Sequence, residues 1–106
     1  MSTGLDTDIT IYVAMSENII RYDDWLEAEN VLIWRDAIHD ELEVGAKLSG
    51  EQEKLLAEAD DRLLAARETI VARFPQAFWG EAATKDRWWW HLPDGPDVRE
   101  KAREAV

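Results

Sequence analysis

The chain has 106 residues, of which 46% are hydrophobic and 33% charged, and its formal net charge is -11 at pH 7. This length and composition are typical of one soluble domain with a single core, so we expect one domain over residues 1–106. The negative charge opposes direct binding to nucleic-acid phosphates and to anionic membrane surfaces. The absence of cysteine excludes disulfides and thiolate sites, and it fits a cytoplasmic protein.

The charge is unevenly distributed along the chain. Residues 1–61 hold sixteen acidic and four basic side chains, whereas residues 62–106 hold seven acidic and eight basic ones. A basic partner is therefore expected to prefer the first half. Residues 1–15 have no basic region ahead of an apolar run, as a secretory signal would, and no apolar run is long enough for a membrane-spanning helix, so we expect no membrane association.

The amino-terminal segment is open to more than one interpretation. We expect residues 1–8 to be flexible. Residues 9–13 are rich in β-branched and aromatic side chains, which favours a short strand, with residues 16–18 as the turn of a hairpin. The alternatives are an extended arm or a helix, because Ile9, Tyr12 and Val13 also have helical spacing.

The first predicted helix covers residues 24–45. Asp24 and Glu27 have the spacing of a helix-capping pair, and Gly45 is a natural stop. Its apolar side chains fall on two faces. The main face contains Trp25, Ala28, Val31, Leu32, Ile38 and Leu42, and the second contains Leu26, Ile33, Trp34 and Ala37.

The second predicted helix covers residues 50–74, and it is expected to form an antiparallel helical hairpin with the first. Ser49 and Gln52 fit a capping box, and Pro75 ends the pattern. A short linker between two long helices favours the antiparallel arrangement. One narrow apolar seam runs along this helix at Leu56, Ala59, Leu63, Ala66, Ile70 and Phe74.

The last third of the chain is rich in tryptophan, and we expect it to pack on the hairpin. Trp79 precedes a run of three tryptophans, Trp88, Trp89 and Trp90, and residues 97–106 are predicted to be a short helix or a frayed tail. Three successive side chains point in different directions on a helix or a strand, so they cannot all enter one core. The run is either a lid over the hairpin or a partner-binding site, since tryptophan is enriched at interface hot spots.

One helical face carries side chains that could ligate a metal. Asp36, His39, Asp40 and Glu43 are spaced by three or four residues, and Glu58 and Asp61 could approach from the second helix. Di-metal helical sites require more histidine than this set provides. We therefore interpret the face as solvated and acidic, and predict no metal and no cofactor.

Two basic or titratable side chains, Arg35 and His39, lie among apolar positions of the first helix. If either is buried it must be paired, and an acid of the second helix is the expected partner. The alternative is a role in recognition of a partner. His91 follows the tryptophans, but nothing supplies the rest of a catalytic set, so we predict that the protein is not an enzyme.

The leading hypothesis from the sequence is a non-catalytic protein interaction or regulatory module with a protein partner, which could be basic or a second copy in a homodimer. The alternative is a nucleic-acid mimic that occupies the basic groove of a DNA- or RNA-binding protein. A carboxylate-rich metal-binding protein is the third hypothesis. The candidate partner-binding residues are Leu26, Ile33, Trp34, Trp79, Trp88, Trp89 and Trp90.

Overall fold

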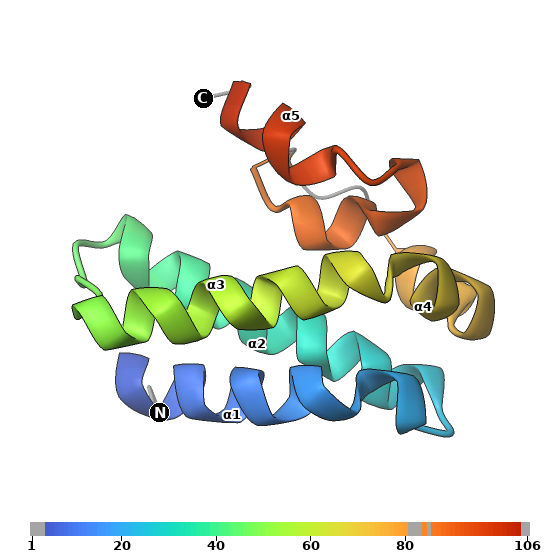
Figure 1. The fold of residues 1–106 in the computed structure, drawn as a ribbon, viewed down its shortest axis with the longest axis horizontal. Helices are drawn as coiled ribbons and strands as arrows, with labels where there is room; N and C mark the ends of the chain where they lie inside the picture. Colours follow the sequence, from blue (N-terminus) through green and yellow to red (C-terminus); the bar gives the residue numbers. More distant parts are fainter. Residues whose placement is uncertain (1–3, 81–83, 85, 105–106) are drawn as a thin grey trace.

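The computed structural model describes residues 4–80, 84 and 86–104, and these residues form a mainly helical fold in which no strand occurs (Figure 1). This confirms the predicted mainly helical class. No helix of the described part is long and apolar enough to cross a membrane. The elements in chain order are α1 (Leu5–Asn18), η1 (Ile19–Arg21), α2 (Trp25–Glu43), α3 (Gly50–Ala65), α4 (Arg67–Arg73), η2 (Pro75–Phe78), η3 (Trp88–Asp94) and α5 (Val98–Glu104), where η denotes a 3-10 helix.

The predicted strand or hairpin at the amino terminus is wrong, because residues 9–13 lie within α1. Ile9, Tyr12 and Ser16 are buried and recur at steps of three and four, which places them on one side of a helix. Burial of this face outweighs the local β propensity of the segment. Residues 5–8, expected to be flexible, form the first turn of α1.

The predicted start of α2 at Asp24 is confirmed, although the Asp24 side chain bonds Leu26 and not Glu27, its expected capping partner. The Asp24 side chain accepts a hydrogen bond of 3.0 Å from the backbone N–H of Leu26, which satisfies a donor at the helix start. Helix α2 ends at Glu43, and Gly45 adopts a φ of 106° in the following turn. That φ favours glycine.

The predicted capping box of the second helix is also confirmed, but the helix is shorter than expected. Ser49 and Gln52 exchange hydrogen bonds of 3.1 and 2.9 Å at the start of α3. The helix stops at Ala66, where the backbone turns to φ -94° and ψ 8°, and α4 continues from Arg67. No glycine or proline marks this break in the sequence.

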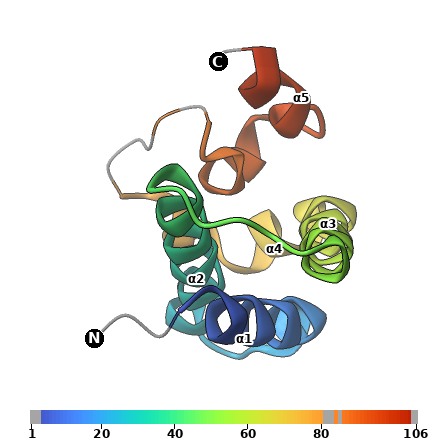
Figure 2. The same cartoon turned by 90° about the vertical axis from the view of Figure 1, so that its left-hand side faces the viewer.

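The first three α-helices form a triangle in cross-section (Figure 2). Helix α1 packs against both α2 and α3, whereas α2 and α3 approach one another less closely than either approaches α1. The chain does reverse direction between α2 and α3 (Figure 1), but the two are not the closely packed pair that we expected. The amino-terminal helix, not a strand, therefore supplies the third side of the core.

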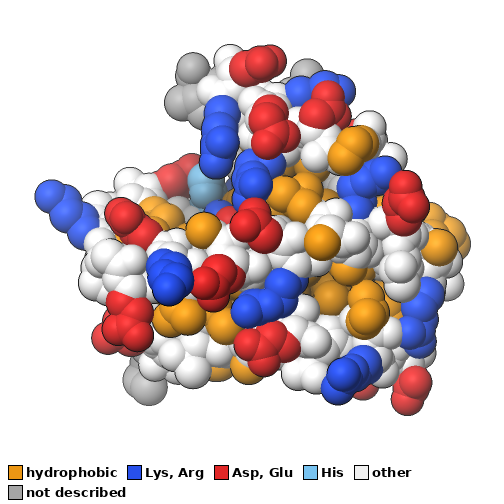
Figure 3. Space-filling model, viewed as in Figure 1, with side chains coloured by type: hydrophobic (Ala, Val, Ile, Leu, Met, Phe, Trp, Pro, Cys, Tyr) orange, Lys and Arg blue, Asp and Glu red, His pale blue; other side chains and the backbone are white. Residues whose placement is uncertain are grey.

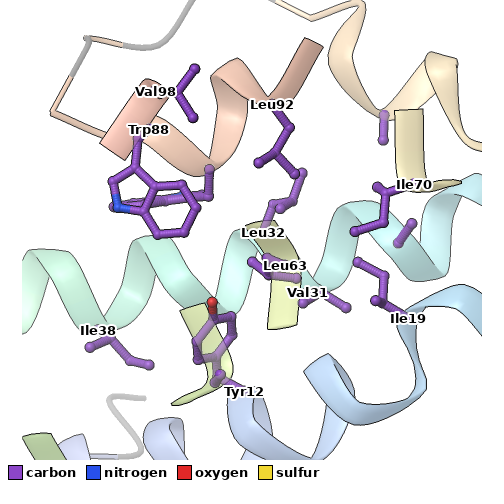
Figure 4. Close-up of a cluster of buried hydrophobic side chains, with 14 of the residues drawn as sticks. Tyr12, Ile19, Val31, Leu32, Ile38, Leu63, Ile70, Trp88, Leu92 and Val98 are labelled. Atoms are coloured by element: carbon purple, nitrogen blue, oxygen red, sulfur yellow. The ribbon is translucent and has the colours of Figure 1, made fainter. Parts of the chain in front are cut away.

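The carboxyl-terminal segment closes the remaining side of the core (Figure 4). Side chains from α1, α2, α3 and α4 meet those of η3 and α5 in one buried cluster. The expected seam of the second helix is buried at five positions and half-buried at Ala66. The buried contributions of η3 and α5 are Trp88, Trp89, Leu92, Val98 and Ala102.

Candidate functional site

The outward side of α2 carries a line of apolar side chains that we call the outer stripe: Leu26, Ile33 and Ala37 on the helix and Val44 at its C-cap, all exposed except the half-buried Ala37. At 3.6 residues per turn these four positions lie within about 20° of one line along the helix. Leu26 is 50% exposed, Ile33 46% and Val44 87%. The opposite side of α2 is in the core, so this helix is apolar on both sides and only one of them is covered.

The charged side chains around the outer stripe are acidic. Glu27, Asp40 and Glu43 are exposed on α2, although Asp40 is paired with Arg87 and Glu43 with His39, and the one arginine of the helix, Arg35, is buried on the core side. Surfaces of this kind attract basic groups through long-range charge. The outer side of α2 therefore combines apolar contact area with a negative border.

The tryptophan side chains divide into core and surface. Trp88 and Trp89 are buried, Trp90 and Trp34 are half-buried against the core, and Trp79 is 74% exposed. Trp79 follows η2, which packs against α2. In this fold the tryptophan run therefore serves mainly as a lid, and Trp79 is the indole that a partner could reach.

Asp36 is the acceptor that holds this lid onto α2. One of its carboxylate oxygens, Oδ1, accepts hydrogen bonds from the indole N–H groups of Trp89 and Trp90 at 2.8 and 2.9 Å, and from Arg87 at 3.0 Å. Arg87 also donates to Asp40. Burial alone would lower the pKa of Arg87, but the bonds to Asp40 and Asp36 raise it above its ordinary value.

A buried ion-pair network connects three helices. The Arg35 guanidinium donates twice to Asp60, from Nε at 3.0 Å and from Nη2 at 3.2 Å, and the Tyr12 hydroxyl donates to the same carboxylate at 2.7 Å. The guanidinium carbon also lies 4.3 Å from the centroid of the Trp89 ring. This contact is a cation–π interaction. It places the Trp89 ring against the Arg35 guanidinium, whose Nη1 has no hydrogen-bond partner. The predicted pairing of Arg35 with an acid of the second helix is confirmed.

The environment of Tyr12 suppresses its ionisation. Burial, together with the negative charge of Asp60, raises the pKa of the Tyr12 phenol well above its ordinary value, and Arg35 offsets part of this. The hydroxyl therefore stays protonated and donates to Asp60.

Several acids of the first half are paired with bases of the second half. Besides the bonds of Arg87, Arg99 of α5 pairs with Asp61 at 2.8 Å, and Arg62 of α3 lies 3.7 Å from Glu17 of α1. Figure 3 shows acidic and basic side chains interspersed over the face that carries α3 and α5. The charge asymmetry of the sequence is thus partly neutralised within the folded chain.

The candidate metal-ligating side chains of α2 do not form one cluster in the structure. Asp36 and Asp40 are bound to Arg87, and Asp61 is bound to Arg99 rather than facing α2. His39 instead contacts Glu43 on its own helix and Asp86 from the segment before η3. Asp86 was not among the predicted ligands, because no local pattern in the sequence links it to His39, 47 residues earlier.

His91 lies apart from these groups. Its Nδ1 is 3.2 Å from Asp94, and both residues border a shallow groove of about 310 Å³ that is also lined by Val98, Lys101 and Ala102. A histidine and one exposed acid do not make a catalytic set by themselves.

Comparison of the chain with known protein families, with curated proteins and with solved structures finds no match.

Proposed function

We propose that this chain is a small, cytoplasmic, non-catalytic interaction module that binds a partner protein through the outer stripe of α2. The observation that carries the proposal is the alignment of Leu26 and Ile33 on the exposed side of α2, continued by Val44 at its C-cap, while the other side of the helix is core. Single exposed apolar side chains are ordinary, but an aligned patch with a polar border is typical of an interaction site. Trp79 offers a further anchor of the type enriched in hot spots.

The charges beside the outer stripe favour a basic partner. Glu27 borders it without a printed ion pair, Glu43 lies beside His39, and Asp40 is already paired with Arg87, while α2 exposes no lysine or arginine. An amphipathic helix with apolar side chains at steps of three and four, bordered by lysine or arginine, would complement both features. The opposite charges would speed the association of such a partner with α2 and would disfavour binding of acidic competitors.

The same charges disfavour a homodimer through this surface. Two copies of α2 brought together in either direction would place acid against acid, because the helix offers no exposed base to pair with them. Like charges opposed across an interface are costly. The nucleic-acid mimic has weaker support, because Arg62, Arg87 and Arg99 already occupy several of the acids it would need.

A capture experiment from a native lysate, followed by purification of the captured protein, tests the proposal. We expect a partner with a basic amphipathic helix whose affinity falls as salt rises, since salt screens exposed charges. Leu26→Asp with Ile33→Asp should abolish capture, whereas Ile20→Asp, an exposed apolar position on η1, should not. A nucleic-acid-binding protein that is captured equally by the wild type, the double variant and Ile20→Asp would support the nucleic-acid mimic instead.

Sedimentation of the wild-type chain over a hundredfold dilution separates this proposal from self-association. We expect a monomer throughout. A dimer that the double variant Leu26→Asp, Ile33→Asp converts to a monomer would show that a second copy covers the outer stripe.

A further inference from the structure

Three potential metal ligands meet beside the lid, on the flank of α2. The Nε2 atom of His39 lies 2.9 Å from Oε1 of Glu43 and 3.2 Å from Oδ2 of Asp86. The three ligand atoms all lie within 4.8 Å of one another. His39 and Glu43 are one helical turn apart, and Asp86 arrives from the segment that precedes η3, so the cluster joins two distant parts of the chain.

The spacing and the chemistry of these atoms suit a divalent cation. Zinc binds imidazole nitrogen and carboxylate oxygen at about 2.0–2.2 Å, which brings neighbouring ligand atoms to the separations found here. An imidazole favours zinc and similar first-row metals over calcium or magnesium, which prefer sets made only of oxygen. Glu43 is exposed and Asp86 half-buried, so solvent can reach the cluster and complete the coordination.

The surroundings fix two of the three ligands. The Thr84 hydroxyl donates to Oδ1 of Asp86, which leaves Oδ2 directed at His39. This bond, more than any other interaction, holds the pKa of the Asp86 carboxyl below its ordinary value. The His39 ring rests edge-on against Trp89, with ring centroids 5.4 Å apart. Such outer contacts orient metal ligands in proteins.

We propose that His39, Glu43 and Asp86 form a binding site for a single divalent cation of the zinc class, which goes beyond the proposed partner binding. The ion would tie the segment before η3 to α2. Asp36, three residues before His39 in α2, already holds the same segment through its hydrogen bond from Arg87. A bound cation would therefore reinforce the attachment of the lid.

Titration calorimetry of the full chain with zinc chloride tests the site. The wild type should bind one zinc ion per chain, and calcium should not compete. His39→Gln and Glu43→Gln should each lower the zinc affinity by at least about tenfold. Substitution of residues that only support a metal ligand already lowers affinity by about ten- to a hundredfold, so loss of a ligand should cost at least as much. His91→Gln is the matched control, because it removes the other histidine of the chain and should bind zinc like the wild type.

Two results would overturn the proposal. One is wild-type zinc affinity no higher than that of Glu43→Gln, whose exposed side chain can be changed without loss of the fold. The other is a loss of zinc binding in His91→Gln that equals the loss in His39→Gln, which would place binding at His91. Circular dichroism of each variant verifies that it is folded.

Discussion

Arg35 of α2 and Asp60 of α3 form a two-bonded ion pair in the core, and each side chain is only 9% exposed. The pair links two helices whose backbones do not pack closely on one another. Tyr12 of α1 donates to the same carboxylate, so Asp60 of α3 is hydrogen-bonded to both of the other two helices, α1 and α2.

Removal of one member of this pair should be severely destabilising. Asp60→Ala leaves a buried guanidinium without its counter-charge, and we expect a loss of about 3–5 kcal/mol in the free energy of unfolding measured in urea. Asp61→Ala, which removes the neighbouring exposed acid paired with Arg99, should cost only about 0–1 kcal/mol. Equal losses for the two variants would contradict the central role of Asp60.

The double variant Arg35→Met, Asp60→Ala should be less destabilised than Asp60→Ala alone, because it no longer buries an unpaired charge.

Alkaline pH should unfold the protein as Tyr12 ionises. The folded-state pKa of Tyr12 lies above the unfolded value of about 10, so the stability linked to this phenol is complete below pH ~10 and is lost as pH rises above it. In Tyr22→Phe, which leaves Tyr12 as the single tyrosine, tyrosinate absorbance should appear together with the loss of helical circular dichroism. Ionisation at an ordinary pKa with the helices intact would contradict the buried network.

The lid should depend on Asp36. Asp36→Ala removes the acceptor of two indoles and Arg87, and we expect it to cost about 1–3 kcal/mol in urea unfolding. The control is Asp40→Ala, which loses only an exposed bond to Arg87 and should cost at most about 1 kcal/mol. A change in tryptophan fluorescence before global unfolding should accompany Asp36→Ala alone. Identical unfolding of the two variants would argue against Asp36 as the anchor.

The core seam of α3 can be tested at adjacent positions. Leu63 is fully buried, so Leu63→Ala should cost about 2–5 kcal/mol. Leu64, the next residue, is half-buried, and Leu64→Ala should cost clearly less when both are measured by urea unfolding. A loss below about 0.5 kcal/mol for Leu63→Ala, as is usual for surface changes, would place it outside the core.

Features encoded by neighbouring residues could be predicted from the sequence. Asp24 and Ser49 act through bonds to residues two or three positions away, and both helix starts are where the capping patterns place them. The side of α2 that faces the core and the burial of Arg35 against an acid of the second helix also follow from helical periodicity and the cost of an unpaired buried charge.

Features decided by distant contacts could not be predicted. The helical state of residues 9–13 depends on packing of Tyr12 against helices that follow it, including its bond to Asp60, 48 residues later. The break at Ala66 has no glycine or proline to signal it. The approach of Asp86 to His39 depends on how the lid folds back, which no local pattern in the sequence specifies.

The affinity of the purified partner for the double variant Leu26→Asp, Ile33→Asp tests the proposed binding surface most directly. Both residues are exposed, so the variant should remain folded, with a loss of stability below about 1 kcal/mol. We expect its affinity for the partner to fall by about thirtyfold or more, the effect of removing a hot spot, while Ile20→Asp binds like the wild type. A double variant that stays folded and binds the partner as tightly as the wild type would contradict the assignment of the outer stripe of α2 as the binding surface.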